Sequence, residues 1–360
     1  MIPEYVDQVD ADWLSDALSV RRPGTRVEKL EQVSDRPGAG NKLWCRVGYR
    51  EPTDLPDTFV VKGGFTRRDP DEFTVAWEAM TRGLNAAEAR FYRDFAASDA
   101  APHELEIPAC YYAGTDDTGR AAVVLEDLTA TGVSFGAFDR PLDRDTAALV
   151  LEQLALVHAA WWADPVLDGP RLADPLVEGN GLLHYFITGS NWDEQMSRPR
   201  GARVPPELRD HGKVVAAVRA MWERQFDGPL CTLHGDPHIG NLYFRTDGRV
   251  GLLDWQVFCR GTFATDVAYF IAGALSTGER RAHERDLLRH YLACLAALGV
   301  DAPSEADAWD RYRERLFHGF LNLLTPADGI QSEEYNATMG ERFATAIVDL
   351  DAFEAVRRPR

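Results

Sequence analysis

The chain has 360 residues, enough for one large domain or two, and its apolar content of 45% permits a sizeable core. The formal net charge of −18 argues against nucleic acid or an anionic membrane surface as a partner. The five cysteines are odd in number and form no Cys-x-x-Cys pair, so we expect neither a disulfide framework nor a zinc site. The start shows no signal peptide, and no apolar run is long enough for a membrane span, so we expect a cytoplasmic protein.

The first third of the chain is rich in strand patterns. Apolar spacing predicts a helix over residues 4–20 and another over residues 71–97. Alternating or continuous apolar runs predict five strands, at Val27–Val33, Leu43–Tyr49, Thr58–Val61, Ile107–Ala113 and Ala121–Leu125.

Helical patterns dominate after Leu128, and strand patterns return only around residues 230–258. The predicted helices cover residues 143–162, 263–277, 280–297, 305–325 and 334–356. Residues 163–212 are rich in Pro, Gly and Asp, and they form either a substrate-covering insertion or an irregular surface connection. The whole pattern predicts an α+β fold with a strand-rich part, residues 1–126, and a helical part, residues 127–360.

The most informative segment runs from His234 to Asp266. Asp236 and Asn241 are five residues apart in a loop that contains Gly and Pro, and Asp254 follows a short apolar strand thirteen residues later. Phosphoryl transfer needs one group that orients the attacking hydroxyl and oxygen ligands for the magnesium on the nucleotide. Asp236 suits the first role, and Asn241 and Asp254 suit the second. A simple turn-forming loop would explain the glycines and the proline, but not two carboxylates and an amide at this spacing.

At these residues the chain resembles the aminoglycoside phosphotransferase and choline kinase-like superfamily. The run Asp254-Trp-Gln, followed by Asp266-Val-Ala-Tyr, is most similar to the ecdysteroid kinase-like branch. The resemblance implies a two-lobed protein-kinase-like fold, with a small antiparallel-sheet lobe, a larger helical lobe and the nucleotide between them. In that family Asp266 would brace the catalytic loop.

The same resemblance suggests nucleotide contacts in the strand-rich part. The loop with Gly38, Gly40 and Asn41 occupies the place of the family's phosphate-covering loop, although most loops of this kind bind nothing. Glu126 and Leu128 occupy the place of the hinge, where backbone groups would bind adenine.

Lys62 ends a predicted strand and could reach the α- and β-phosphates if a carboxylate held it in place. Glu88 is the expected partner, because its surroundings resemble the Glu-x-x-Phe-Tyr helix of the branch. Glu88 also fits a helix-capping role together with Asn85. A solvated lysine at a strand end is the alternative for Lys62.

The histidines allow other interpretations. His234 and His158 are expected to be structural, with His158 buried and hydrogen bonded in the core. The spacing His234-x-Asp236-x-His238 also permits a metal-dependent hydrolase, which would need further ligands nearby.

The sequence therefore predicts an ATP-dependent kinase that phosphorylates a hydroxyl group of a small molecule, with Mg²⁺ as cofactor and Asp236 as catalytic base. A catalytically inactive, nucleotide-binding pseudokinase is the alternative from another functional class. Protein-kinase signatures are absent, so no protein substrate is expected. Aminoglycosides, choline-like alcohols, sugars and hydroxylated steroids or lipids all remain open as acceptors, and the sequence does not distinguish ATP from GTP or give the oligomeric state.

Overall fold

The computed structural model describes residues 1–36, 41–66, 68, 75, 83–169, 172–174, 176–177, 181–326 and 331–358. These residues form two compact units, each described by itself below. The first unit consists of residues 1–101, 107–133 and 254–256, and the second of residues 102–106, 134–253 and 257–360.

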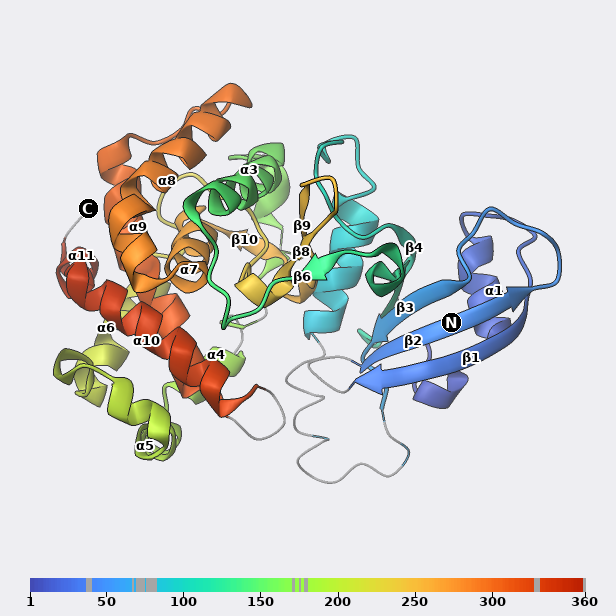
Figure 1. Cartoon of the computed structure of the whole chain (residues 1–360), viewed down its shortest axis with the longest axis horizontal. Coiled ribbons are helices and arrows are strands. Elements are labelled where there is room, and N and C mark those ends of the chain that lie inside the picture. Colours follow the sequence, from blue (N-terminus) through green and yellow to red (C-terminus); the bar gives the residue numbers. More distant parts are fainter. Residues whose placement is uncertain are drawn as a thin grey trace. The chain divides into compact units, whose positions relative to one another are not determined.

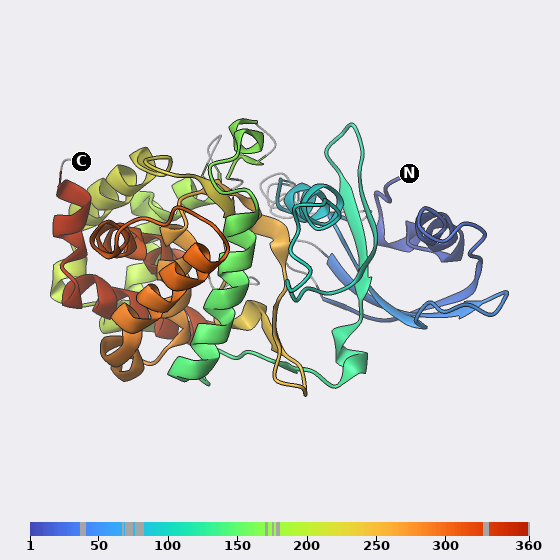
Figure 2. The same ribbon diagram turned by 90° about the horizontal axis from the view of Figure 1, so that it is seen from above.

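The first unit is built on a five-stranded antiparallel sheet with the strand order β1-β2-β3-β5-β4. Its strands are β1 (Val27–Arg36), β2 (Asn41–Tyr49), β3 (Thr58–Gly63), β4 (Cys110–Thr115) and β5 (Ala121–Glu126). Alternate residues of β2 are buried, and they form a core with Leu14 and Leu18 of α1 (Ala11–Ser19). Figures 1 and 2 show α1 against this sheet. The period-two pattern of the sequence thus produces a sheet with an apolar face for one amphipathic helix.

A second helical segment of the first unit covers residues 83–90 and continues as a π-helical turn over Phe91–Phe95. Leu84, Phe91 and Phe95 are buried. The rest of the helix predicted over residues 71–97 lies mostly outside the described residues. Residues 83 and 84 are already helical, so Asn85 is inside the helix and the predicted capping role of Asn85 was wrong.

The second unit is mainly helical. Its longer helices are α3 (Arg144–Ala160), α6 (His211–Glu223), α7 (Ala264–Ala274), α8 (Thr277–Ala297), α9 (Glu305–Phe320) and α10 (Glu333–Asp349). Helix α7 is buried along nearly its whole length and packs against α9, α8 and α10 (Figure 1). The shorter α4 (Leu182–Phe186), α5 (Gly189–Ser197) and α11 (Ala352–Arg357) lie in this unit too.

Short strands carry the loop of interest in this unit. β8 (Leu242–Phe244) pairs with β9 (Val250–Leu252) and with β6 (Ser134–Phe135), and β7 (Cys231–Leu233) pairs with β10 (Cys259–Gly261). An antiparallel sheet in one unit and packed helices in the other confirm the predicted α+β fold class.

Some predicted boundaries were wrong. The helix expected over residues 334–356 is two helices, because Asp351 adopts a left-handed conformation with φ of 47° between α10 and α11. Residues 163–212, which the sequence left unassigned, contain α4 and α5. No helix of the described residues is long and apolar enough to cross a membrane.

Candidate active site

Lys62 lies at the centre of a buried charge cluster in the first unit. Its Nζ is 2.6 Å from Oε1 of Glu88 and 2.9 Å from Oδ1 of Asp254. The side chains of Lys62 and Glu88 are only 6% and 2% exposed. The alternative of a solvated lysine at a strand end is therefore wrong, and the structure brings together three of the residues that the sequence singled out.

A second lysine completes the cluster. Lys42 of β2 is directly opposite Lys62 of β3 in the sheet register, and its Nζ is 2.7 Å from Oδ2 of Asp254. Like charges opposite each other on neighbouring strands repel. Asp254 offsets this repulsion by binding one ammonium group with each carboxylate oxygen.

The charges in the cluster determine which carboxylate is most readily ionised. Burial opposes ionisation of Asp254, but the charges of Lys62 and Lys42 outweigh it and hold the pKa of Asp254 far below its usual range. Burial raises the pKa of Glu88, the charge of Lys62 opposes this effect, and the charge of Asp254 adds to it. Burial would lower the pKa of Lys62, but Asp254 and Glu88 together raise it. Asp254 is thus the ionised carboxylate that two cations surround.

The backbone at Asp254 is strained. Its φ is 68°, a left-handed conformation that few residues other than glycine adopt. Strain of this kind persists only where surrounding contacts fix it, and it is concentrated at functional sites. Here the next two side chains provide such contacts. Trp255 stacks on Phe91, with ring centroids 3.6 Å apart, and Gln256 donates to Oδ1 of Asn85 at 3.3 Å.

In the second unit, Asp236 and Asn241 share one tight loop. The side-chain amide of Asn241 donates to the carbonyl of Asp236 at 2.9 Å and is 3.4 Å from its Oδ2. Since the amide nitrogen is engaged by Asp236, Oδ1 is the atom of Asn241 that could bind a metal ion. Gly235 is required in this loop, because its φ is +84° and an added Cβ would come within 2.3 Å of the carbonyl oxygen of Val257.

Asp266 braces the loop that contains Asp236, as the family resemblance implied. Its carboxylate accepts hydrogen bonds from the backbone N–H groups of His234 at 2.7 Å and Gly235 at 3.0 Å. It also binds Nε2 of buried His158, whose Nδ1 accepts from the hydroxyl of Tyr291 at 2.7 Å. His158 is therefore the buried, hydrogen-bonded histidine that the sequence predicted.

His234 fixes the loop in the same way. Its Nδ1 accepts from the backbone N–H of Asp236 at 3.2 Å, so Nε2 carries the proton and donates to the carbonyl of Leu253 at 3.1 Å. Both ring nitrogens are used by the backbone, which confirms the structural role expected for His234 and leaves it unsuited to proton transfer.

His238 does not create a hydrolase site in the described part of the chain. Its Nε2 is 3.7 Å from Oδ2 of Asp236, and its Nδ1 accepts from the N–H of Gly240. Among the described residues, the only group of three or more His, Cys, Asp or Glu side chains close enough to share a metal ion lies on α3 and α8 and includes neither Asp236 nor His238.

Two tyrosines that the sequence did not assign lie close to Asp236. Burial, followed by the negative charge of Asp236, raises the pKa of Tyr269 on α7 and of Tyr335 on α10 well above the usual value. Both hydroxyls therefore stay protonated. Asn322 donates to the hydroxyl oxygen of Tyr269 at 3.0 Å, and the Tyr335 ring lies edge-on to His238.

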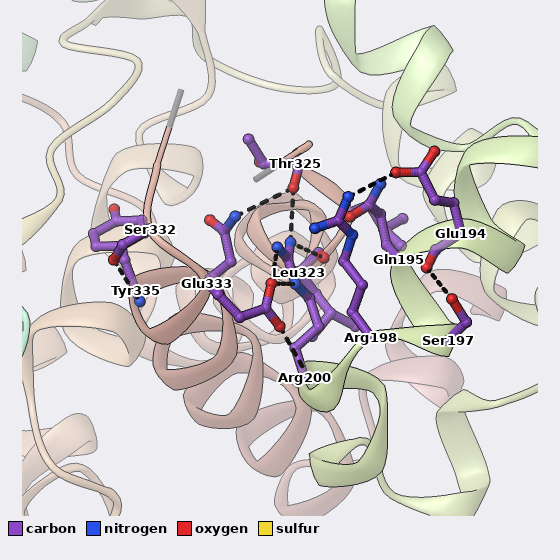
Figure 3. Close-up of polar contacts among 12 residues, drawn as sticks. Glu194, Gln195, Ser197, Arg198, Arg200, Leu323, Thr325, Ser332, Glu333 and Tyr335 are labelled. Carbon is purple, nitrogen blue, oxygen red and sulfur yellow. Dashed lines mark hydrogen bonds and ion pairs between the residues drawn. The ribbon is translucent and has the colours of Figure 1, made fainter. Parts of the chain in front are cut away.

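A buried arginine fixes the start of the helix that carries Tyr335 (Figure 3). Arg200 is fully buried, and its Nε donates to Glu333 at 2.9 Å. Its Nη1 donates to the carbonyls of Leu323 at 3.0 Å and Thr325 at 2.7 Å. Part of the unassigned segment 163–212 is thereby tied to the first turn of α10.

The remaining predicted nucleotide contacts are placed as follows. Gly38 and Gly40 lie outside the described residues. Asn41 is the first residue of β2, and its side chain donates to the carbonyl of Phe65 at 2.7 Å. Glu126 ends β5, where its N–H donates to Ala109 at 2.8 Å, and Leu128 is buried at the start of a 3₁₀ turn. The roles of all five residues stay predictions.

Sequence reasoning missed Lys42, Tyr269 and Tyr335. Lys42 is one of only four lysines and adjoins Asn41. Tyr269 follows Asp266 by three residues, which puts both on one face of a helix. Either could have been found from these signals, whereas nothing near Tyr335 in the sequence indicates its proximity to Asp236.

Three solved structures of small-molecule kinases are similar to this chain. A spectinomycin phosphotransferase in complex with ADP and spectinomycin matches with a TM-score of 0.53 at 11% identity, covering 96% of this chain and 99% of that one. A choline kinase from Cryptosporidium parvum Iowa II gives 0.49 at 10% identity, covering 95% and 98%. The choline kinase LicA from Streptococcus pneumoniae gives 0.48 at 12%, covering 94% and 98%. The first of these bears out the predicted kinase-like fold.

Comparison at the level of sequence gives the family. No curated protein matches the chain. The profile of the phosphotransferase enzyme family, however, matches residues 78–328, which include Glu88, Asp236, Asn241 and Asp254. The chain therefore belongs to the phosphotransferase enzyme family.

Proposed function

We propose that this protein is an ATP-dependent kinase that transfers the γ-phosphoryl group to a hydroxyl group of a small molecule. The observation that carries the proposal is the position of Lys62, buried between the carboxylates of Glu88 and Asp254. Burying three charged groups together is costly unless they are well paired, and such arrangements are concentrated at functional sites.

Lys62 and Lys42 would bind the phosphates of ATP in this proposal. Both ammonium groups contact Asp254, and incoming phosphate oxygens would compete for them. Glu88 would keep Lys62 in position during this exchange. Gly38, Gly40 and Asn41 would cover the phosphates, and backbone groups of Glu126 and Leu128 would bind the adenine.

The side chains suit magnesium. Asp254 is an ionised carboxylate that already attracts two positive charges, and Asn241 offers a neutral side-chain oxygen. Mg²⁺ prefers oxygen ligands of this kind. Asn241 and Asp254 would hold the ion, which would neutralise charge on the phosphates.

Asp236 would accept the proton of the substrate hydroxyl. The hydroxyl oxygen forms a bond to the γ-phosphorus, the bond from that phosphorus to the β,γ-bridging oxygen breaks, and ADP leaves. Since positioning counts more than basicity in phosphoryl transfer, a carboxylate of ordinary pKa is adequate. Tyr269 and Tyr335 have protonated hydroxyls close to Asp236, and we assign them to orient its carboxylate or the acceptor.

The class of acceptor is a further part of the proposal. The resemblance of Asp254-Trp-Gln and Asp266-Val-Ala-Tyr to the ecdysteroid kinase-like branch favours a bulky hydroxylated compound over a small alcohol. The five cysteines form no disulfide in the described part of the chain, which suits a reducing compartment, so we propose a cytoplasmic enzyme.

Substrate-dependent ADP release tests the proposed function. The full-length protein is incubated with MgATP and, in turn, with aminoglycosides, choline-like alcohols, sugars and hydroxylated steroids. We expect at least one class to raise ADP release above the level without acceptor and to gain one phosphoryl group by mass spectrometry. MgATP binding without acceptor-dependent turnover across this panel would instead support the pseudokinase.

A further inference from the structure

A second cluster of ligand-type side chains lies in the second unit, outside the proposed phosphoryl-transfer residues. It joins Glu152 of α3 to His290 and Cys294 of α8, two helices that pack against each other. His290 and Cys294 are four residues apart, so they share one face of their helix. All three side chains are partly exposed, which gives an ion from solvent access to them.

The spacing of the donor atoms matches that of a tetrahedral zinc site. Nε2 of His290 is 3.6 Å from Sγ of Cys294 and 3.1 Å from Oε1 of Glu152. One potential ligand atom from each residue lies within 4.8 Å of the other two. Around a tetrahedral Zn²⁺, ordinary bond lengths put nitrogen about 3.6 Å from sulfur and about 3.4 Å from oxygen. Small side-chain movements would therefore complete the site.

The chemistry of the three donors selects the ion. A thiol and an imidazole favour Zn²⁺ over Mg²⁺ or Ca²⁺, which prefer oxygen ligands. A divalent cation favours the thiolate form of a cysteine ligand, so Cys294 would bind the ion as a thiolate.

We propose that Glu152, His290 and Cys294 form a Zn²⁺ site with three protein ligands, and that water takes the fourth position. From the isolated cysteines we expected no zinc site, but the fold brings Glu152 and His290 close to Cys294. The ion would fasten α3 to α8, the helices that also carry the hydrogen-bonded pair His158 and Tyr291. A structural role in the second unit follows.

Cobalt and zinc binding to the untagged, full-length protein test this site. Co²⁺ should produce a thiolate-to-cobalt charge-transfer band in the near ultraviolet and tetrahedral bands in the visible, and one equivalent of Zn²⁺ should abolish both. Cys294→Ser should remove the charge-transfer band. Loss of a residue that merely supports a metal ligand costs about 10–100-fold in affinity, so Cys294→Ser and His290→Gln should each weaken Zn²⁺ binding by at least about 100-fold.

The matched control is His283→Gln on the same helix. Like His290, His283 pairs with a glutamate; its partner is Glu279, at 3.6 Å on the same helix. Among the described residues, no cysteine joins the pair of His283 and Glu279 in a group that could hold a metal ion. Zn²⁺ should raise the melting temperature of the wild type and of His283→Gln, and leave that of Cys294→Ser unchanged. A wild type that shows no charge-transfer band with excess Co²⁺, or a band that persists in Cys294→Ser, would overturn the proposal. Both metal measurements are made without nucleotide or acceptor, so their outcome is independent of the proposed kinase activity.

Discussion

Replacing either residue of the buried pair Lys62 and Glu88 should lower stability, but by different amounts. Glu88→Gln leaves Lys62 bound to Asp254 at 2.9 Å, so we expect a cost of about 1.5 kcal/mol, the scale of one lost charged hydrogen bond. Lys62→Met removes the cation between two carboxylates and leaves Glu88, 2% exposed, without it. Breaking a buried pair in this way costs about 4 kcal/mol.

The double variant should lose less than the sum of these costs. In it Asp254 keeps Lys42, and no buried carboxylate is left at residue 88, so we expect a total of about 3 kcal/mol against a sum of about 5.5 kcal/mol. The resulting coupling of about 2.5 kcal/mol is measurable by urea unfolding at pH 7. The exposed pair of Arg22 and Asp54, in the same unit, serves as the control and should show no resolvable coupling.

Turnover supplies the second measurement on these variants. If Glu88 positions Lys62 for the phosphates, Glu88→Gln should lower kcat for any accepted substrate, although neither group contacts the acceptor. Additive losses of stability within about 0.5 kcal/mol, together with unchanged kcat, would refute the reasoning and leave Glu88 with no part in positioning Lys62.

Two further predictions concern magnesium and pH. Asp254→Ala should weaken MgATP binding in calorimetry while the fold is retained. Asp247→Ala, at an exposed turn, is the control and should leave MgATP binding unchanged. Equal MgATP affinity in both variants would exclude Asp254 as a metal ligand. Burial lowers the pKa of His318 from 6.5 to about 4. Between these pH values the unfolded chain binds a proton that the folded chain does not. The stability of the fold therefore falls as the pH drops from 6.5 to about 4. The loss of stability should reach up to about 3 kcal/mol, reduced by the partial exposure of His318. Urea unfolding at several pH values should show that the stability of His318→Gln depends less on pH than that of the wild type. Parallel pH profiles of stability would contradict His318 as the source of the loss.

Local patterns were enough to predict much of the fold. The strands β2 and β3 match their predicted segments closely, because apolar residues recur at every second position of β2 and form a short continuous run in β3. The helices α3 and α8 were also predicted, since apolar residues recur at helical spacing along α3 and over residues 287–295 of α8. The break between α10 and α11 was not, because it depends on a left-handed residue, Asp351, that is not glycine.

The candidate site, too, was predictable from the sequence only in part. The spacing of Asp236, Asn241 and Asp254 was readable because all three lie within nineteen residues of one loop and hairpin. The contact of Lys42 with Asp254 depends on strand register and on the strained backbone of Asp254, neither of which a local pattern encodes. The proximity of Tyr335 to Asp236 results from helix packing across about a hundred residues, and it could be recognised only in three dimensions.

The comparison of wild type with Asp236→Asn tests the central claim most directly. The substitution keeps the size of the side chain but removes its charge and its ability to accept a proton. Measured with the same accepted substrate, phosphorylation should fall by about a hundredfold or more, while MgATP affinity changes little. Equal turnover by the two proteins would contradict the account, because Asp236 would then not be the catalytic base.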